Sequence, residues 1–544
     1  MNRRLNVIVV GSGVAGMAFA HRLSVLAGKD EVDIRILSKA PPETSNSHAA
    51  QGGVAVVMDP ADSWEQHRDD TLAVGAGRCD PNVVEMVVRE GPQCIQDLLA
   101  LGARFDSDAE GRLDAAREGG HGAARIVHHQ DRTGAELVRV LREQVERSDV
   151  IRIEEPMHAV DLLLDASGEQ QRCCGVRVLD LNTGRITDRH ADVVVLATGG
   201  VGQVFMHTTN PSGATGSGVA MAVRAGVALR DMAFVQFHPT ALYTPDPGTV
   251  FLISEAVRGA GAILLKPNGE RLMAGIHPSG DLAPRNVVAR AIHATMRSTG
   301  APHVRLDARP IGRTRFIHEF PTIYDHCRGM GIDPTTDLIP VMPAAHYLCG
   351  GIRTDAFGHS SLVGLLALGE CACSGLHGAD RLASNSLLEA LVIPRSAATN
   401  VLATARTEHL PDDAGVGADR SDPQDGDYEP TLLQLRNAMT TYLGLVRDQK
   451  GMAEGVRIVS SVLQQADEAW ARGDRSTALM DLRDLASVAL AIADSARSEE
   501  RNVGTHFNID LVPSEASDRL KYNSFSASVR SSELTHHHHV RPLP

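Results

Sequence analysis

The feature that most constrains this chain is a glycine-rich turn that directly follows an apolar run. Residues 5–16 read Leu-Asn-Val-Ile-Val-Val-Gly-Ser-Gly-Val-Ala-Gly, and a helical pattern follows over 17–26. A strand that enters G-x-G-x-x-G and leads into a helix is the setting of a dinucleotide-binding turn. Gly11 permits the tight turn, Gly13 lets the backbone approach a pyrophosphate, and Gly16 lets the helix pack on the strand. The pattern predicts a dinucleotide site and leaves FAD and NAD(P) open.

The second predicted strand, residues 32–37, completes the start of a β–α–β unit. In NAD-dependent enzymes an acidic residue usually follows this strand and binds the ribose 2′-hydroxyl. Ser38 and Lys39 stand there instead, which argues against NAD. The loop over residues 45–53 is small and polar and ends in two glycines, a composition that can lie close against a cofactor.

A further apolar strand enters a glycine turn at residues 192–200. Two such crossings, far apart in sequence, are typical of a doubly wound parallel sheet that holds a dinucleotide at its carboxyl edge. The stretch from 236 to 350 is rich in proline and glycine, which predicts an inserted domain, and helical spacing over 431–500 predicts a bundle. The predicted fold class is α/β, with a Rossmann-like FAD-binding domain, an inserted α+β capping domain and a C-terminal helical bundle.

These patterns divide the chain into five predicted units. A segment low in apolar residues and rich in Asp, Gly and Pro predicts the linker. The units are a discontinuous FAD-binding domain (1–235 and 351–405), a capping and substrate domain (236–350), a linker (406–430), a C-terminal helical domain (431–512) and a polar tail (513–544).

Composition and charge exclude several classes of function. The net charge of −14 argues against a nucleic-acid partner, because phosphate contacts need clustered Lys and Arg. No stretch of 18 apolar residues occurs, so we expect no transmembrane helix and no membrane partner. The eight cysteines include no C-x-x-C, so we expect neither a metal site nor a disulfide framework. A reducing, cytoplasmic location fits this cysteine usage.

Six segments place polar side chains beside glycines or other small residues. Each alone suits an ordinary loop, but together they predict one site. Two arginines and two or three histidines near a flavin would bind a small dianion, because Arg makes bidentate contacts with carboxylates. A glutamate among them would favour a substrate amine, and a helix start would stabilise the reduced flavin. The segments are 117–121, 236–240, 283–285, 345–347, 368–370 and 381–387.

An ordered set of motifs extends this picture over residues 5–510. It includes A-Q-G-G at 50–53, R-E-G-G-H at 117–121, Q-F-H-P-T-A-L at 236–242 and R-L-A-S-N-S-L-L-E at 381–389. In these motifs the chain resembles the L-aspartate oxidase family of the succinate dehydrogenase/fumarate reductase flavoprotein superfamily. The resemblance implies FAD-dependent oxidation of L-aspartate to iminoaspartate, with electrons passed to O₂ or fumarate. It also implies the first step of NAD biosynthesis through quinolinate, with quinolinate synthase as the downstream partner.

The resemblance also implies residue roles. Arg285 would transfer a proton when fumarate is reduced, and Glu118 would orient the substrate amine. The expected catalytic residues are Arg285, His238 and His346, and the expected substrate-binding residues are Glu118, Ser254 and Arg381. The residues expected to hold FAD are Gly11, Ser12, Gly13, Val14, Ala15, Gly16, Lys39, Asn46, Ser47, His48, Ala49, Ala50, Gln51, Gly52, Gly53, Ser217, Glu370, Ser386 and Leu387.

Two positions separate the oxidase pattern from its respiratory relatives. Succinate dehydrogenase flavoproteins attach FAD to a histidine four residues before the alanine of A-Q-G-G. Asn46 occupies that position and His48 lies two residues further on, so we expect non-covalent FAD. Glu118 suits an ammonium-bearing substrate and would repel part of a plain dicarboxylate.

The chain also departs from the usual family pattern. Asp380 adds negative charge directly before Arg381, and Asn286 removes one negative charge beside Arg285. None of the departures deletes a predicted substrate ligand. The departures are Ser217 where the family usually has T-G-D-G, Ala260 where it has R-G-E-G-A, Asn286 where it has A-P-R-D, Asp380 where it has G-A-N-R, and residues 501–506, Arg-Asn-Val-Gly-Thr-His, where it has E-S-R-G-x-H.

Three alternatives stay open at this point. A soluble fumarate reductase or succinate dehydrogenase-like flavoenzyme would reduce fumarate without oxidising an amino acid, and Glu118 argues against it. A divergent amino-acid oxidase would use the same site for another substrate. A catalytically weak flavoprotein that serves as an assembly subunit would hold FAD without turnover, and Arg285, His238 and His346 argue against it.

Overall fold

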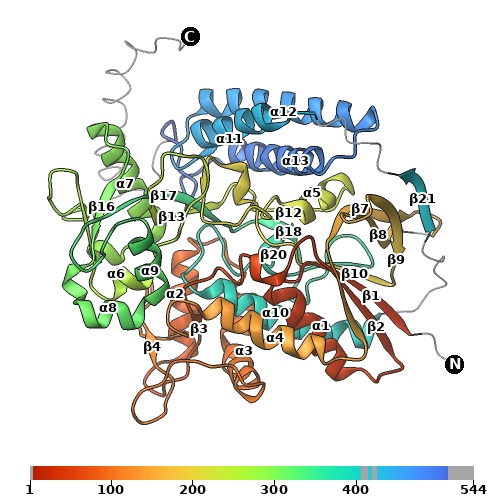
Figure 1. The fold of residues 1–544 in the computed structure, drawn as a ribbon, viewed down its shortest axis with the longest axis horizontal. Coiled ribbons are helices and arrows are strands. Elements are labelled where there is room, and N and C mark those ends of the chain that lie inside the picture. Colours follow the sequence, from red (N-terminus) through yellow and green to blue (C-terminus); the bar gives the residue numbers. More distant parts are fainter. Residues whose placement is uncertain (1–3, 169, 406–413, 420–425, 512–544) are drawn as a thin grey trace.

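The computed structural model describes residues 4–168, 170–405, 414–419 and 426–511. The predicted polar tail and most of the predicted linker lie outside the described residues. The predicted α/β class, with an inserted region and C-terminal helices, is confirmed (Figure 1). Within the described part of the chain, no helix is long and apolar enough to cross a membrane.

A five-stranded parallel sheet forms the base of the fold. Its order is β19 (Leu365–Ala367), β10 (Val193–Leu196), β1 (Leu5–Val10), β2 (Val32–Leu37) and β6 (Ile151–Glu154). On β1, Val7 and Val9 belong to one apolar core, and Ile8 and Val10 belong to another. Successive side chains of a strand point to opposite faces, so the unbroken apolar run reflects a strand buried on both faces.

Helices cover one face of this sheet and a β-meander covers the other. The helical layer contains α1 (Val14–Leu26), α4 (Thr133–Glu146) and α10 (Asn385–Thr404), and α1 packs against both of the others. The meander comprises β7 (Met157–Asp165), β8 (Arg172–Asp180) and β9 (Arg185–His190). Strand β21 (Ala414–Asp419), inside the predicted linker, pairs with β9.

The glycines of the first turn are required by close packing. Gly11 has φ of +114°, and a Cβ atom there would lie 2.2 Å from the carbonyl oxygen of Ala197. A Cβ atom on Gly16 would lie 2.2 Å from the carbonyl oxygen of Gly11. The two glycine crossings therefore meet at the carboxyl edge of the sheet, where a doubly wound fold binds its ligand.

The inserted region forms its own apolar core at one side of the molecule. Its long antiparallel pair is β13 (Val235–Leu242) with β17 (Ile339–Leu348). The pair is extended by β16 (Val304–Asp307) and β15 (Ile263–Leu265). The surrounding helices are α6 (Glu255–Gly259), α7 (Arg285–Thr299), α8 (Arg313–Glu319) and α9 (Pro321–Gly329).

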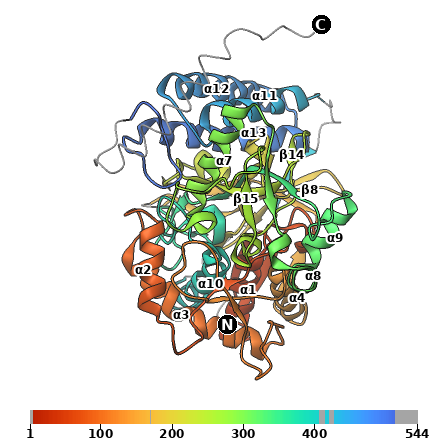
Figure 2. The same ribbon diagram turned by 90° about the vertical axis from the view of Figure 1, so that its left-hand side faces the viewer.

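Three long helices form the C-terminal layer, which Figure 2 shows above the rest of the molecule. They are α11 (Glu429–Leu443), α12 (Gln449–Ala471) and α13 (Thr477–Ser498). Helix α13 packs on α5 (Ser217–Arg224), and its apolar residues join the core that also contains Ile8 and Val10. The helical layer is therefore continuous with the nucleotide-binding core.

The remaining elements are short or peripheral. Helices α2 (Trp64–Val74) and α3 (Pro81–Ala100) lie in the chain between the first strand of a small three-stranded sheet, β3, and its other two strands, β4 and β5. The remaining strands are β3 (Val54–Ala55), β4 (Ala115–Ala116), β5 (Ile126–Val127), β11 (His207–Thr208), β12 (Leu229–Arg230), β14 (Gly248–Thr249), β18 (Gly351–Arg353) and β20 (Ala372–Cys373).

Candidate functional site

A cavity of about 650 Å³ lies at the carboxyl edge of the parallel sheet. Its walls come from the first glycine turn, the 45–53 loop, the inserted region and the start of α10. All six residues predicted to bind substrate or take part in catalysis line this cavity. Of the predicted FAD residues, the lining includes Gly11, Ser12, Gly13, Ala15, Lys39, Asn46, Ser47, Ala49, Ala50, Gln51, Gly52, Gly53, Ser217, Glu370, Ser386 and Leu387.

The residues around the first turn fit a bound FAD. Ser47 Oγ accepts a hydrogen bond of 3.1 Å from the backbone N–H of Val14 at the start of α1. A helix N-terminus of this kind favours a pyrophosphate. Asn46 and Thr198 line the cavity, and within the described residues Asn46 Oδ1 and Thr198 Oγ1 are buried without hydrogen-bond partners. Buried polar atoms are nearly always paired, so these two atoms are suited to a polar ligand in the cavity.

The other end of the cavity reaches the C-terminal helices. Lys39 forms an ion pair with Asp481 of α13, and Thr477 from the first turn of α13 also lines the cavity. His158 of β7 is buried there, and neither ring nitrogen has a partner within the described residues. Burial lowers the pKa of His158 to about 3. This neutral imidazole and the helix α13 close the end opposite the inserted region.

Two neutral histidines face one another from the long antiparallel pair of the inserted region. The ring centroids of His238 on β13 and His346 on β17 are 5.1 Å apart. Burial first, and then the positive charge of Arg285, lowers the pKa of both rings well below 6.5. The Thr240 N–H donates to His238 Nδ1 over 3.2 Å, which leaves Nε2 to carry the ring proton. Each ring can therefore donate to a substrate oxygen without adding charge.

Two arginines share one acceptor beside these histidines. Gln236 Oε1 accepts from Arg285 Nη1 at 3.0 Å and from Arg381 Nη2 at 3.1 Å. Arg381 Nη1 also donates to Ser386 Oγ at 3.0 Å, and its guanidinium lies 4.6 Å from the Tyr347 ring centroid. Arg381 Nε has no partner among the described residues. The pair offers adjacent positive charge for carboxylates.

Arg285 begins a chain of charges that runs through Glu255 in the cavity wall to the buried Arg258. Its Nε donates to Glu255 Oε2 over 2.6 Å, and the other oxygen of Glu255 lies 3.6 Å from Arg258 Nη2. Burial opposes the charge on Glu255, but Arg285 and Arg258 outweigh burial and lower the pKa of this carboxyl. Glu255 is therefore ionised and can exchange a proton with Arg285 through their hydrogen bond.

Glu118 is the second carboxyl of the site and has the opposite tendency. It is 3% exposed, and burial together with the negative charge of Glu255 raises its pKa. Ser384 Oγ donates to Glu118 Oε2 over 2.6 Å. A Cβ atom on Gly52 would lie 3.2 Å from Glu118 Oε1. The A-Q-G-G loop therefore brings the cavity wall directly against this carboxyl.

A polar network behind the cavity holds the turn that carries Ser384. His121 Nε2 lies 2.9 Å from the carbonyl oxygen of Ala383, and Arg125 Nη1 lies 3.2 Å from His121 Nδ1. Asn385 donates to Thr71 Oγ1 at 3.0 Å and lies 2.9 Å from His67 Nε2. Burial lowers the pKa of His67 to about 3 and that of His121 to about 4, so both rings are neutral supports.

The cofactor loop and the inserted region are joined by one amide. Gln51 Nε2 donates to the carbonyl of Leu252 at 2.7 Å, and Gln51 Oε1 accepts from the N–H of Ser254 at 3.2 Å. Ser254 Oγ in turn accepts from the N–H of Ala256 at the start of α6. The inserted region is thereby set over the cavity, where it excludes water.

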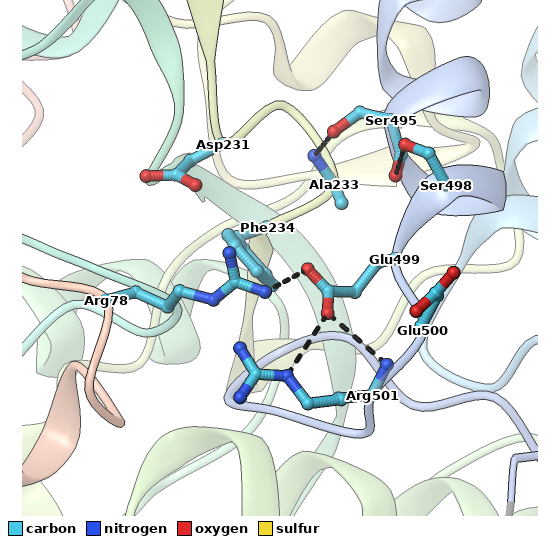
Figure 3. Close-up of a pocket in the computed structure, with 9 residues that line it drawn as sticks. All are labelled: Arg78, Asp231, Ala233, Phe234, Ser495, Ser498, Glu499, Glu500 and Arg501. Atoms are coloured by element: carbon cyan, nitrogen blue, oxygen red, sulfur yellow. Dashed lines mark hydrogen bonds and ion pairs between the residues drawn. The ribbon is translucent and has the colours of Figure 1, made fainter.

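A second hollow, of about 400 Å³, lies where the end of α13 meets the β12–β13 connection (Figure 3). Arg78 pairs with Glu499, which also lies 3.9 Å from Arg501 Nε. Ser495 Oγ accepts from the N–H of Ala233 at 3.0 Å. These contacts tie α13 to the FAD-binding region, and we interpret the hollow as a structural junction.

Comparisons with known proteins agree with this geometry. The family model described as FAD binding domain matches residues 6–387. The L-aspartate oxidase of Streptomyces coelicolor is 43% identical over 524 residues, covering 93% of this chain and 88% of that protein. The corresponding oxidase of Pseudomonas aeruginosa is 40% identical and covers 95% of this chain and 97% of its own length. The chain belongs to the L-aspartate oxidase family.

Solved structures place this L-aspartate oxidase family member in a wider fold group. Quinol fumarate reductase of E. coli matches with a TM-score of 0.84 at 29% identity, covering 94% of this chain and 92% of that chain. Mycobacterium smegmatis Sdh1 matches with a TM-score of 0.77 at 27% identity, covering 95% and 91%. FAD is therefore the cofactor that the family implies, and the cavity fits it.

Three of the residues expected to hold FAD do not line the cavity in this family member. Val14 is fully buried in the core beneath the turn. Gly16 faces the carbonyl of Gly11, so its role is packing. His48 lies outside the lining, while Asn46 of the same loop donates to Glu370 Oε2 at 3.2 Å. This placement supports the proposal that FAD is bound without a covalent link.

Sequence reasoning did not assign several residues that line the cavity of this family member. Thr209 Oγ1 lies 2.7 Å from His346 Nδ1, and Asn210 donates to the His346 carbonyl at 2.9 Å. Both belong to the segment T-T-N-P at residues 208–211, for which the sequence alone predicted no role. Glu255 follows Ser254 directly, and that adjacency was the available signal. Asp481 had none, because its helix reaches the cavity only through tertiary packing.

Proposed function

We propose that this protein oxidises L-aspartate to iminoaspartate with FAD as its cofactor. One observation carries the proposal: a single cavity joins the FAD-type turn to two arginines, two neutral histidines and the buried carboxyl of Glu118. This donor set matches two carboxylates and one amine on a four-carbon amino acid. When bound, FAD supplies the acceptor for the hydride that leaves Cα.

The chain's own residues bind and orient the substrate. Arg285 and Arg381 provide charge for the two carboxylates, and His238 and His346 donate neutral hydrogen bonds to the same oxygens. Glu118 faces the amine, and its raised pKa makes it a better proton acceptor than an exposed carboxylate. The ammonium must lose one proton before its lone pair can assist hydride loss from Cα. Iminoaspartate then leaves, with one further proton released.

The electrons pass to O₂ or to fumarate in this proposal. In fumarate reduction one carbon of the double bond accepts hydride and the other carbon of that bond accepts a proton. We assign this proton to Arg285, because Glu255 contacts Arg285 and also lies beside the buried Arg258, so the proton could be replaced through these groups. The fumarate reductase matches favour fumarate as one acceptor.

The pathway and location are also part of the proposal. Iminoaspartate is reactive in water, so we place quinolinate synthase downstream as the enzyme that consumes it, in NAD biosynthesis. The eight cysteines are free thiols, which supports a reducing, cytoplasmic location.

Anaerobic absorbance of the FAD-loaded protein tests the proposed reaction. L-Aspartate should bleach the oxidised flavin band, whereas D-aspartate and succinate should leave it unchanged. Glu118→Gln should reduce the preference for L-aspartate over succinate, because the amine loses its charged partner. No bleaching by L-aspartate with FAD bound would overturn the proposal. Fumarate reduction by a reduced dye without bleaching by L-aspartate would favour a fumarate reductase instead.

A further inference from the structure

Asp380 is a buried carboxylate beneath the substrate site. It is 1% exposed, stands directly before Arg381 and is not part of the cavity lining. Its Oδ1 accepts from Gln236 Nε2 over 2.5 Å, while its Oδ2 has no hydrogen-bond partner among the described residues. A half-satisfied carboxylate in the interior is costly, so its presence calls for a physical reason.

The amide of Gln236 links this carboxylate to both substrate arginines. Gln236 Nε2 donates to Asp380 and also to the carbonyl of Arg381 at 2.8 Å. An ionised carboxylate only accepts hydrogen bonds, so it requires the NH₂ end of the amide. Gln236 Oε1 then points the other way and accepts from Arg285 and Arg381. If the amide were reversed, its NH₂ group would face the N–H groups of Arg285 and Arg381, and these donors would have no acceptor.

The charges that face Asp380 come from two sides. Arg285 and Arg290 belong to α7, and Arg381 belongs to the loop before α10. The thiol of Cys349, beyond the end of β17, also faces it. Burial raises the pKa of Asp380 to about 6 although Gln236 and the three arginines oppose that shift. At pH 8 the group is therefore an ionised counter-charge.

Position 286 lies in the same cluster. Asn286 Nδ2 donates to the carbonyl of Gly504 at 2.7 Å, and Arg290 Nη1 donates to the same carbonyl at 3.0 Å. The neighbouring Thr505 N–H donates to the carbonyl of Ala379, directly before Asp380. Asn286 Oδ1 is buried without a partner among the described residues. This chain has Asn286 where the family pattern has Asp, and Asp380 where that pattern has Asn. The carboxylate and the amide have therefore exchanged positions within one buried cluster.

We propose that Asp380 is a positioning residue: it is the buried counter-charge that orients Gln236 and holds Arg285 and Arg381 together for a dicarboxylate. The inference rests on the proposed function for its substrate. In this chain Asp380 supplies the counter-charge, and an aspartate at position 286 could supply it from the other side of the same cluster. Asp380 acts through the arginines and does not touch the substrate.

The first test is Asp380→Asn in FAD-loaded protein at pH 8. Loss of the counter-charge should raise the KM for L-aspartate by about tenfold, the effect of losing one charge-assisted hydrogen bond, with a smaller change in kcat. The dissociation constant of succinate, read from perturbation of the oxidised flavin spectrum, should rise similarly. If Asp380 only repelled the substrate, both constants would fall. Unchanged or lower constants would overturn the inference.

The second test moves the carboxylate. Asn286→Asp should lower the KM in the Asp380→Asn background, to within about threefold of the original chain. The same substitution alone should raise KM, because two carboxylates would then share one cluster. Opposite signs in the two backgrounds define the coupling. The same effect in both backgrounds would overturn the inference.

Two further readouts separate the possible failures. If Asp380→Asn does not yield folded protein, the comparison is between Asn286→Asp and the double variant Asn286→Asp/Asp380→Asn. The double variant should bind succinate more tightly than Asn286→Asp. If the original chain is not bleached by L-aspartate, the proposed function fails. Succinate binding then still tests the positioning role, because it needs no turnover.

Discussion

Ser384 donates a 2.6 Å hydrogen bond to Glu118 from a backbone in the left-handed region, with φ of 61°. A non-glycine residue in this region costs about 1 kcal/mol or more. The strain persists because His121 faces the Ala383 carbonyl and Asn385 is held by Thr71 and His67. The turn therefore aims a hydroxyl at the carboxyl that we assign to the substrate amine.

Ser384→Ala and Ser384→Gly should separate this hydrogen bond from the backbone strain. Both variants lose the donor to Glu118, so kcat/KM for L-aspartate should fall by about tenfold, as for a bond to a charged group. Glycine tolerates the left-handed backbone, so the glycine variant should unfold at a higher temperature than the alanine variant. Full activity in either variant would show that Ser384 does not orient Glu118.

Arg285→Leu should abolish fumarate reduction and leave the spectrum of bound flavin largely intact. The reason is that Arg285 is the cavity residue joined to the Glu255–Arg258 charges. Glu255→Gln keeps a hydrogen-bond acceptor for Arg285 but removes the negative charge. It should lower the rate of fumarate reduction while changing the dissociation constant of succinate by a smaller factor. Dye-coupled rates and flavin titrations measure the two effects. A normal reduction rate in Arg285→Leu would contradict the assignment.

Asp481→Asn should weaken FAD binding, because Asp481 pairs with Lys39 at the end of the cavity reached by α13. We expect the FAD dissociation constant to rise by about three- to tenfold, the range for a partly exposed ion pair and its ligand contacts. Flavin fluorescence titration measures it. Asp467→Asn on α12 is a matched control whose ion pair with Arg483 lies outside the cavity lining. Equal affinities in both variants would remove α13 from the cofactor site.

Stability should fall as the pH drops below about 6.5. The folded chain holds His67 and His158 with pKa values of about 3 and His121 with a pKa of about 4. The unfolded chain takes up protons near pH 6.5, so each ring's contribution is complete above that pH and is lost progressively toward pH 4. Each ring removes about 1.4 kcal/mol per pH unit in this window. Buried Glu370, whose pKa burial raises to about 7, works in the opposite direction.

Urea unfolding midpoints between pH 7.5 and 5 measure this trend. His67→Gln can keep a hydrogen bond to Asn385 without titrating. The variant should take up one proton fewer on unfolding, so its free energy of unfolding should fall less steeply with decreasing pH. If the midpoint of His67→Gln changes with pH as steeply as that of the original chain, His67 does not contribute to the trend as a neutral buried ring.

The parts of the fold that follow local rules were predictable. The apolar run before Gly11 predicts a strand, and β1 occupies these residues. Strand β2 covers the predicted residues 32–37, and α11, α12 and α13 fill the region of helical spacing. These patterns depend on side-chain period and on backbone angles that neighbouring residues impose. The boundaries of the five units stay predictions. Strand β11 lies before the predicted boundary at 235/236, yet it pairs with β14 and β17, which lie after it.

The site was predictable in its residue types but not in its connections. The motifs placed Arg285, Arg381 and Glu118 in one site, and all three line the cavity. No local pattern could show that Ser384 meets Glu118, because 266 residues separate them. The same holds for Gln236, which links Asp380 to two arginines across 144 residues.

The sequence by itself determined the strand–glycine–helix turn, the helical C-terminal region and the set of charged residues available for chemistry. Short-range sterics and hydrophobic period are enough for these. Only the tertiary structure decided which charges are buried, which share a partner and which end of each amide faces them. Burial and low dielectric set those energies, and both arise only when distant segments pack together.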